Sequence, residues 1–240
     1  FPLNYVNGFV PDQIVGLDGV GEGTLTVKGP LKNLDFNGEI YLDSTYLVSA
    51  PYGIRMRFAD DPVQIHNSHI QFENFELFAS NGSPLDISGY LDFSNLNKMQ
   101  LDAQLRAKDF QIINAKKNPR SEVYGKAFVD FTGRINGLLN NLQLVGNLDV
   151  LGSTDVTYVV RDGTLSTDDD LKDLVQFTNF NDSTVNVVKR PDITGFTMGL
   201  NVDIDEQAHV LCALNADQSN YVDFVGGGNL LLNYDPTNGV

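Results

Sequence analysis

The chain has 240 residues, of which 42% are hydrophobic, so it can bury a core and is not a disordered polypeptide. Its formal net charge of −15 opposes binding to nucleic acid and to anionic lipid headgroups, which argues against a groove that tracks phosphates. Cys212 is the single cysteine, so no internal disulfide can form. The sequence also lacks the run of about 18 apolar residues that a membrane-spanning helix needs.

Neither end of the sequence has the features of a natural terminus. No methionine or apolar signal region precedes Phe1, and the last residues, Asp235 to Val240, form a turn that no strand follows. We therefore expect a fragment of a longer polypeptide, with any membrane anchor or targeting signal outside it.

Strand patterns fill most of residues 1–164. After an apolar start that is broken by Pro and Gly over residues 1–20, apolar residues recur at every second position, which is typical of half-buried strands. Asn81-Gly82 is a strong hairpin signal between two such segments. The strand-like segments lie at residues 24–28, 40–42, 46–48, 54–58, 63–65, 70–78, 87–93, 101–113, 127–131, 148–150 and 158–160, and residues 70–78 form either a strand pair or one bulged strand.

Residues 165–192 interrupt this alternation and contain the best helix candidate in the sequence. Thr167 is a suitable N-cap, and Asp168 to Asp170 follow in the first turn, where carboxylates interact favourably with the helix dipole. Alternation returns over residues 193–240. We therefore predict an all-β protein with at most one short helix, built as one elongated, curved antiparallel sheet of roughly fourteen strands.

One pattern occurs twice within the strand-rich region. The copies match without a gap at five positions, Gly29 with Gly137, Leu31 with Leu139, Asn33 with Asn141, Leu34 with Leu142 and Gly38 with Gly146. Each copy has the pattern of a strand, a tight turn and a second strand. Repeated hairpins favour an elongated sheet over a compact fold with a single, non-repeated site. We expect the sheet to turn at the second glycine of each copy.

The histidines, carboxylates and cysteine form no recognisable catalytic or metal site. His66 and His69 lie in strand-like sequence, where an odd separation predicts rings on opposite faces, and no third ligand is evident nearby. Asp168 to Asp170 lack the spacing and central glycine of a calcium loop. Cys212 falls on the apolar side of its strand, as a packing thiol would. We expect no enzymatic activity, metal or cofactor.

Three segments near the end of the sequence form a specific pattern: the run Met198 to Ile204, the strand Val210 to Leu214, and Gly226-Gly-Gly-Asn-Leu-Leu-Leu-Asn-Tyr-Asp-Pro236, which is the most specific part. Together they resemble the conserved C-terminal region of the TamB family, in the AsmA-like superfamily. The repeated glycine units are also similar to the family's repeat. The resemblance therefore covers most of the chain but does not account for residues 165–192.

This resemblance implies a long sheet folded like a taco around a hydrophobic channel. It implies a periplasmic protein of a Gram-negative bacterium that bridges the inner and outer membranes, with an inner-membrane anchor outside this fragment. The implied partners are phospholipid acyl chains, an outer-membrane barrel of the Omp85 type (TamA-like) and nascent outer-membrane proteins. Two roles stay open: phospholipid conduction along the groove, and chaperone-like assembly of outer-membrane barrels and autotransporters by strand augmentation.

The apolar face of the predicted sheet is the candidate site. Its ordinary interpretation is a core that faces a second sheet, whereas an uncovered face would be a lipid-binding groove. A long repeated sheet needs something to cover its apolar face, which favours the groove. We expect the lining to comprise Leu25, Val27, Ile40, Leu42, Ile87, Leu91, Phe93, Leu101, Leu105, Val129, Phe131, Leu148, Val150, Met198, Leu200, Val202, Val210, Leu214, Leu230 and Leu232.

We predict three consecutive segments within this one sheet. Residues 1–164 form a groove of repeated hairpins, residues 165–192 an irregular or short-helical insertion, and residues 193–240 the last strands of the groove.

Overall fold

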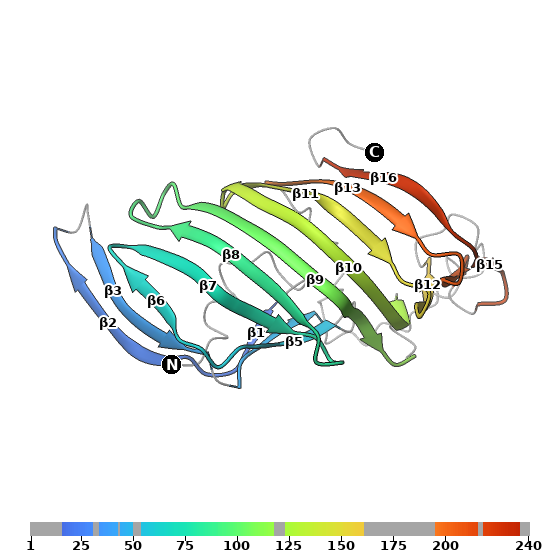
Figure 1. Ribbon diagram of the computed structural model, residues 1–240, viewed down its shortest axis with the longest axis horizontal. Coiled ribbons are helices and arrows are strands. Elements are labelled where there is room, and N and C mark those ends of the chain that lie inside the picture. Colours follow the sequence, from blue (N-terminus) through green and yellow to red (C-terminus); the bar gives the residue numbers. More distant parts are fainter. Residues whose placement is uncertain are drawn as a thin grey trace, which may run out of the picture.

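The computed structural model of the chain describes residues 16–30, 34–42, 44–49, 54–117, 123–160, 195–215 and 218–235. These residues form a single sheet of sixteen strands, and none of them lies in a helix (Figure 1). The predicted all-β fold class is therefore confirmed. The helix predicted within residues 165–192 lies outside the described residues.

Four long antiparallel strands form the centre of the sheet. They are β7 (His69–Phe78), β8 (Pro84–Asp92), β9 (Gln100–Ala115) and β10 (Val123–Leu138). Each has apolar residues at alternate positions over much of its length, so one face of the pleated strand can be buried while the other stays in water.

The two outer strands of this centre, β7 and β10, each pair with one strand along their first half and with another along their second half, so the sheet branches at both of them. We call the branches that extend from the first half of β7 and from the second half of β10 the long wall. The long wall comprises β2 (Glu22–Lys28), β3 (Asp35–Tyr41), β6 (Val63–His66), β11 (Asn141–Val150), β13 (Phe196–Ile204) and β16 (Gly228–Tyr234).

The other pair of branches, the short wall, extends from the second half of β7 and the first half of β10. Its strands have three to five residues each. The short wall comprises β1 (Gly16–Asp18), β4 (Tyr46–Ser49), β5 (Ile54–Phe58), β12 (Asp155–Val159), β14 (His209–Ala213) and β15 (Tyr221–Val225).

Two ladders of the sheet are parallel rather than antiparallel. β11 pairs in parallel with β13, and β12 pairs in parallel with β14. Parallel neighbours need a crossover of a dozen or more residues, and residues 161–194 supply that length between β12 and β13. All the strands from β1 to β16 belong to the same sheet.

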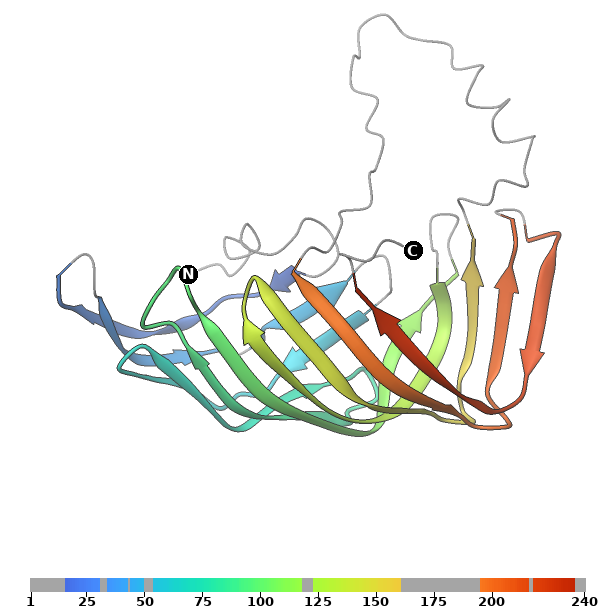
Figure 2. The same ribbon diagram turned by 90° about the horizontal axis from the view of Figure 1, so that it is seen from above.

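The chain crosses between the two walls at short turns that line up along a crease. Leu42 to Thr45 connect β3 to β4, and Leu151 to Thr154 connect β11 to β12, with the same sequence pattern Leu-x-Ser-Thr. In both turns the threonine amide donates to the leucine carbonyl, at 3.0 Å for Thr45 and 2.9 Å for Thr154. The turn Asp205 to Ala208 continues the crease between β13 and β14. The result is an open, curved trough (Figure 2).

The threonine of the second turn ties the crease to β10. Thr154 is 3% exposed, and its Oγ1 accepts from the Phe128 amide at 3.0 Å and donates to the Phe128 carbonyl at 3.1 Å. The hydroxyl therefore bonds to both backbone polar groups of Phe128. Phe128 lies between the part of β10 that pairs with β12 of the short wall and the part that pairs with β11 of the long wall.

Replacing this threonine with its isostere is expected to destabilise the sheet. Thr154→Val removes the acceptor of the Phe128 amide, whereas the Phe128 carbonyl keeps the Leu151 amide as a donor at 2.9 Å. Because a buried amide is left unpaired, the free energy of unfolding should fall by about 1–3 kcal/mol in urea denaturation. The control is Thr132→Val, an exposed threonine on β10, which should change it by less than about 0.5 kcal/mol. Equal losses in the two variants would contradict this role for Thr154.

The two copies of the sequence repeat fold into hairpins with the same register. Gly38 lies opposite Leu25 on β2, and the equivalent Gly146 lies opposite Gly133 on β10. A Cβ atom at Gly38 would collide with the carbonyl oxygen of Thr24, and one at Gly146 with the equivalent carbonyl of Thr132. The second glycine of each copy thus permits a close approach between neighbouring strands.

The most buried part of the trough lies where the short wall folds against the central strands. Met56 and Phe58 of β5 pack in one cluster with Leu77, Phe110 and Val129 of β7, β9 and β10. The ring centroids of Phe58 and Phe75 are 5.8 Å apart in a tilted arrangement. This cluster packs the short wall against the central strands, and Leu148 and Val150 of the long wall pack against it in turn, so it fixes the angle between the two walls.

Candidate functional site

The candidate site is the concave face of the trough, on which apolar residues form continuous rows across the strands. Residues that are opposite each other in a ladder point to the same face, so the register defines each row from β7 to β16. The first row is Phe72, Gly89, Ala103, Ile135, Leu144, Met198 and Tyr234; the second is Phe75, Ile87, Leu105, Gly133, Gly146, Leu200 and Leu232; the third is Leu77, Leu85, Ala107, Phe131, Leu148, Val202 and Leu230.

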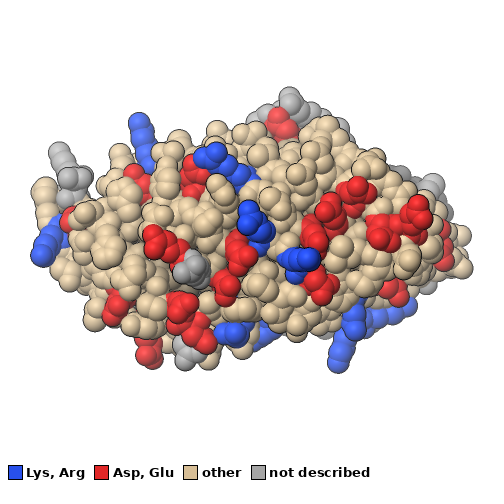
Figure 3. Space-filling model, viewed as in Figure 1, with Lys and Arg blue, Asp and Glu red and all other residues tan. Residues whose placement is uncertain are grey.

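The opposite, convex face is mostly polar and carries many of the charges (Figure 3). Arg134 on β10 donates two hydrogen bonds to Asp102 on β9, from Nε to Oδ1 at 2.8 Å and from Nη2 to Oδ2 at 2.5 Å. These hydrogen bonds hold the pKa of Asp102 below its ordinary value. The convex face is therefore suited to water, and the concave face is not.

The concave face is least covered at its two ends. Ala103 and Phe110 near the centre are buried, whereas Leu25 on β2 and Leu230 on β16 are 50% and 47% exposed. At the end of the short wall, Phe224 on β15 is 58% exposed. Apolar surface is thus accessible at both ends of one continuous face, which is the arrangement of an open groove rather than of a closed pocket.

The register places the predicted lining residues that lie in strands on this same concave face. They are Leu25, Val27, Ile40, Ile87, Leu91, Leu101, Leu105, Val129, Phe131, Leu148, Val150, Met198, Leu200, Val202, Val210, Leu230 and Leu232. Leu42, Phe93 and Leu214 lie immediately beyond strand ends. That any of these residues contacts a ligand remains a prediction.

Sequence reasoning missed several members of the rows. Ile135, Leu144 and Tyr234 have the same parity as predicted residues on their own strands, so strict alternation along each strand would have found them. Phe72 lies on β7, where no lining residue was predicted. Phe36 on β3 was also missed, although its ring lies 5.6 Å from that of Phe93 at one end of the trough.

The convex face also has two hollows, which are lined mainly by polar residues, although Val202 and Leu230 of the third row also line one and Leu105 and Gly133 of the second row also line the other. One is lined mainly by Asn147, Asp149, Asn201, Asp203 and Asn229. Its amides are already engaged, because Asn201 Nδ2 donates to Asn147 Oδ1 at 3.0 Å and Asn229 Nδ2 donates to Asp203 Oδ2 at 3.1 Å. Charged residues, including Asp86 and Arg106, line the other hollow. Side-chain hydrogen bonds between neighbouring strands explain this polar surface.

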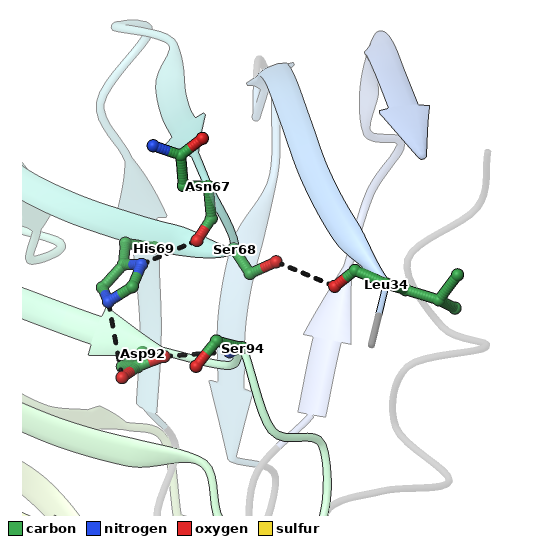
Figure 4. A network of polar contacts seen from close by, with 6 residues as sticks. All are labelled: Leu34, Asn67, Ser68, His69, Asp92 and Ser94. Carbon is green, nitrogen blue, oxygen red and sulfur yellow. Dashed lines mark hydrogen bonds and ion pairs between the residues drawn. The ribbon is translucent and has the colours of Figure 1, made fainter. Parts of the chain in front are cut away.

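The prediction that His66 and His69 point to opposite faces is wrong. Asn67 and Ser68, with φ of 50° and 61°, form a turn between β6 and β7, so the two histidines are direct partners across the hairpin. His69 contacts the Asn67 carbonyl at 2.8 Å and Asp92 at 3.4 Å (Figure 4).

Ser68 links this hairpin to β3. Its hydroxyl donates to the Leu34 carbonyl at 3.3 Å (Figure 4). The same hydroxyl accepts from the Phe36 amide at 3.1 Å. On the other side of the hairpin, the Ser94 amide donates to Asp92 at 2.9 Å and lowers the pKa of that carboxyl. The network therefore fastens one end of the long wall and uses its polar groups in doing so.

Other kinds of site find little support in the described part of the chain. No group of three or more His, Cys, Asp or Glu side chains is placed to hold a metal ion among those residues. Within the same residues, no helix has the length and hydropathy to cross a membrane. The half-buried Cys212 on β14 is a free thiol.

An open sheet that is creased along its length, apolar on its concave face and polar on its convex face, defines an amphipathic β-groove protein. The family model of the TamB C-terminal domain matches residues 73–240, from within β7 to the end of the chain. The chain belongs to the TamB family. No curated protein and no solved structure matches the chain with significant similarity.

Family membership supplies a general role for the groove. TamB proteins are non-enzymatic assembly or transport modules that act in outer-membrane assembly, in the envelope of Gram-negative bacteria. The match begins inside β7, so the central strands from β8 to β10 and the branches beyond β10 all lie within the matched domain.

Proposed function

We propose that the trough conducts phospholipid between the two membranes by burying acyl chains against its concave face. The observation that supports this proposal most strongly is the continuity of the apolar rows over successive strands, with exposed apolar residues at both ends. An acyl chain can move along such a surface without crossing a polar barrier.

The energetics of this surface suit transfer rather than tight capture. Each methylene that leaves water gains about 0.8 kcal/mol, and this gain depends little on which apolar residue the methylene meets. Aliphatic and aromatic residues of similar polarity therefore provide many equivalent positions along the rows. The headgroup would stay in water at the open side of the trough, because the rows offer it no polar partner.

We place this conduit in the periplasm, held to the inner membrane by a segment outside residues 1–240. Its outer end would meet an outer-membrane barrel of the Omp85 type, and phospholipid would be the cargo.

Purification in the absence of detergent, followed by mass spectrometry of extracted lipid, tests this proposal. We expect phospholipid to co-purify with the chain and to be displaced by a fluorescent fatty acid, because both would occupy the same rows. A chain that carries no lipid and does not enhance the fluorescence of that probe would count against conduction.

A second candidate function rests on β15 and β16, the outermost described strands at one end of the two walls. Within the described residues each of these strands pairs on one side alone, and apolar side chains project to both faces. Leu230 and Leu232 point into the trough, whereas Leu231 points outward and is 63% exposed. An outermost strand of a sheet can bind an extended strand of a client protein, as a chaperone-like scaffold would.

The two functions differ in what the chain holds. Photo-crosslinkers at outward positions of this edge, such as Leu231, should capture nascent outer-membrane protein if the edge binds clients. Crosslinks to client together with an absence of bound lipid would favour the scaffold, and bound lipid without client crosslinks would favour the conduit.

A further inference from the structure

His209 occupies a bridging position on the outer face of the short wall. It is the first residue of β14, and its imidazole lies between carboxylates from the strands on either side. Nδ1 is 2.8 Å from Asp155 Oδ1 on β12, and Nε2 is 2.7 Å from Asp223 Oδ1 on β15. A single side chain therefore connects three successive strands.

This geometry requires a doubly protonated ring. An ionised carboxylate only accepts hydrogen bonds, and a neutral imidazole has a single N–H, so it can donate to just one of the two aspartates. The imidazolium donates to both. The hydrogen bonds with Asp223 and then Asp155 accordingly raise the pKa of His209 above its ordinary value.

The strand held by this contact is the edge of the short wall. β15 pairs only with β14 among the described strands, and all five of its residues are exposed. A strand of this length, with solvent on its free side, depends on few interactions beyond its ladder. The contact between His209 and Asp223 adds a charged link across that ladder.

We propose that His209 is a pH-sensitive clasp that fastens the edge strand β15 to the rest of the short wall when protonated and loosens it when neutral. This regulation does not depend on what the trough carries, so it stands apart from the proposed lipid conduction. Its consequence is that the free edge and the apolar side chains Val222 and Phe224 become more mobile as the pH rises.

The direction follows from the charges around the ring. A histidine whose pKa is raised by folding stabilises the fold fully below its unfolded value of about 6.5, and that contribution is lost as pH rises through the folded value. The groups that contact the ring are Asp155 on β12 and Asp223 on β15, and two further carboxylates, Asp205 and Glu206, precede β14 in its turn. Lys126 on β10 lies opposite Asp155 in the ladder. The charges around the ring are therefore mainly negative and favour the imidazolium.

Hydrogen exchange measured by mass spectrometry tests the clasp. The chain has three histidines, so the variant His66→Gln/His69→Gln leaves His209 as the single imidazole. In this background, the protection factors of peptides that cover β15 should fall about two- to five-fold between about pH 5.5 and about pH 8.5, after correction for the intrinsic exchange rate. Peptides from β9, at the centre of the sheet, serve as the internal reference and should not change.

Two further variants in the same background separate the clasp from general destabilisation. His209→Gln should remove the pH dependence and leave β15 at its low protection throughout. His209→Lys keeps a cation between the aspartates at both pH values, so β15 should stay protected throughout. Protection of β15 that is independent of pH before these changes, or the same pH dependence in the presence of His209→Gln, would overturn the proposal.

Discussion

Met198→Arg is expected to reduce the phospholipid that co-purifies with the chain by at least about tenfold. Met198 lies near the start of β13, half-buried on the concave face between Leu144 and Tyr234. A guanidinium at this position would lose hydration without gaining a partner, or would draw water into the rows, and either effect interrupts a continuous apolar surface at a cost of several kcal/mol. Leu148→Arg, in another row, should have the same effect.

The matched control is Val145→Arg on the neighbouring strand. Val145 lies on the convex face and is 42% exposed, so an added charge there stays in water and should leave lipid binding unchanged. Far-UV circular dichroism and a urea titration should show that all three variants fold. If folded Met198→Arg and Leu148→Arg both carry as much lipid as Val145→Arg, lipid does not follow the rows.

Phe110→Ala is expected to lower the free energy of unfolding by about 3–5 kcal/mol. Phe110 is 3% exposed and packs in the cluster that joins β5 of the short wall to β9 and β10. Truncation leaves a cavity at the place where the two walls meet, so the angle between them should loosen as well. Urea denaturation measures the first effect, and hydrogen exchange in β5 measures the second.

Phe224→Ala supplies the comparison on the same concave face. Phe224 is 58% exposed at the edge of the sheet, so its removal should change the free energy of unfolding by less than about 1 kcal/mol. A loss in Phe110→Ala no larger than in Phe224→Ala would show that the cluster does not hold the walls together.

Alternation along the sequence is sufficient to predict which side chains share a face. Ile87 and Leu91 are four residues apart, and Leu200 and Val202 are two apart. Side chains at every second position of a strand share a face, so these pairs can be assigned to one face without knowing which strands lie next to them. The same reasoning failed at His66 and His69, because Asn67 and Ser68 reverse the chain without a glycine or proline to mark the turn.

The arrangement of the strands was less accessible from the sequence. The rows depend on register, which is set by pairs such as Ile87 with Leu105 that are far apart in the chain. The parallel ladder between β11 and β13 has no local signature at all. The crease could be predicted in part. The pattern Leu-x-Ser-Thr is visible in the sequence at both Leu42 and Leu151, but only the structure shows that each copy forms a turn between the two walls.

The identical register of the two repeated hairpins gives the trough a defined increment of length. Leu25 on β2 and Gly133 on β10 are equivalent positions, and six ladders separate their strands through β3, β6, β7, β8 and β9. Neighbouring strands lie about 4.8 Å apart, so one unit advances the sheet by roughly 29 Å. Gain or loss of one unit would therefore change the length of the trough while its cross-section stays the same. The number of repeated units would thus set the length of the apolar face.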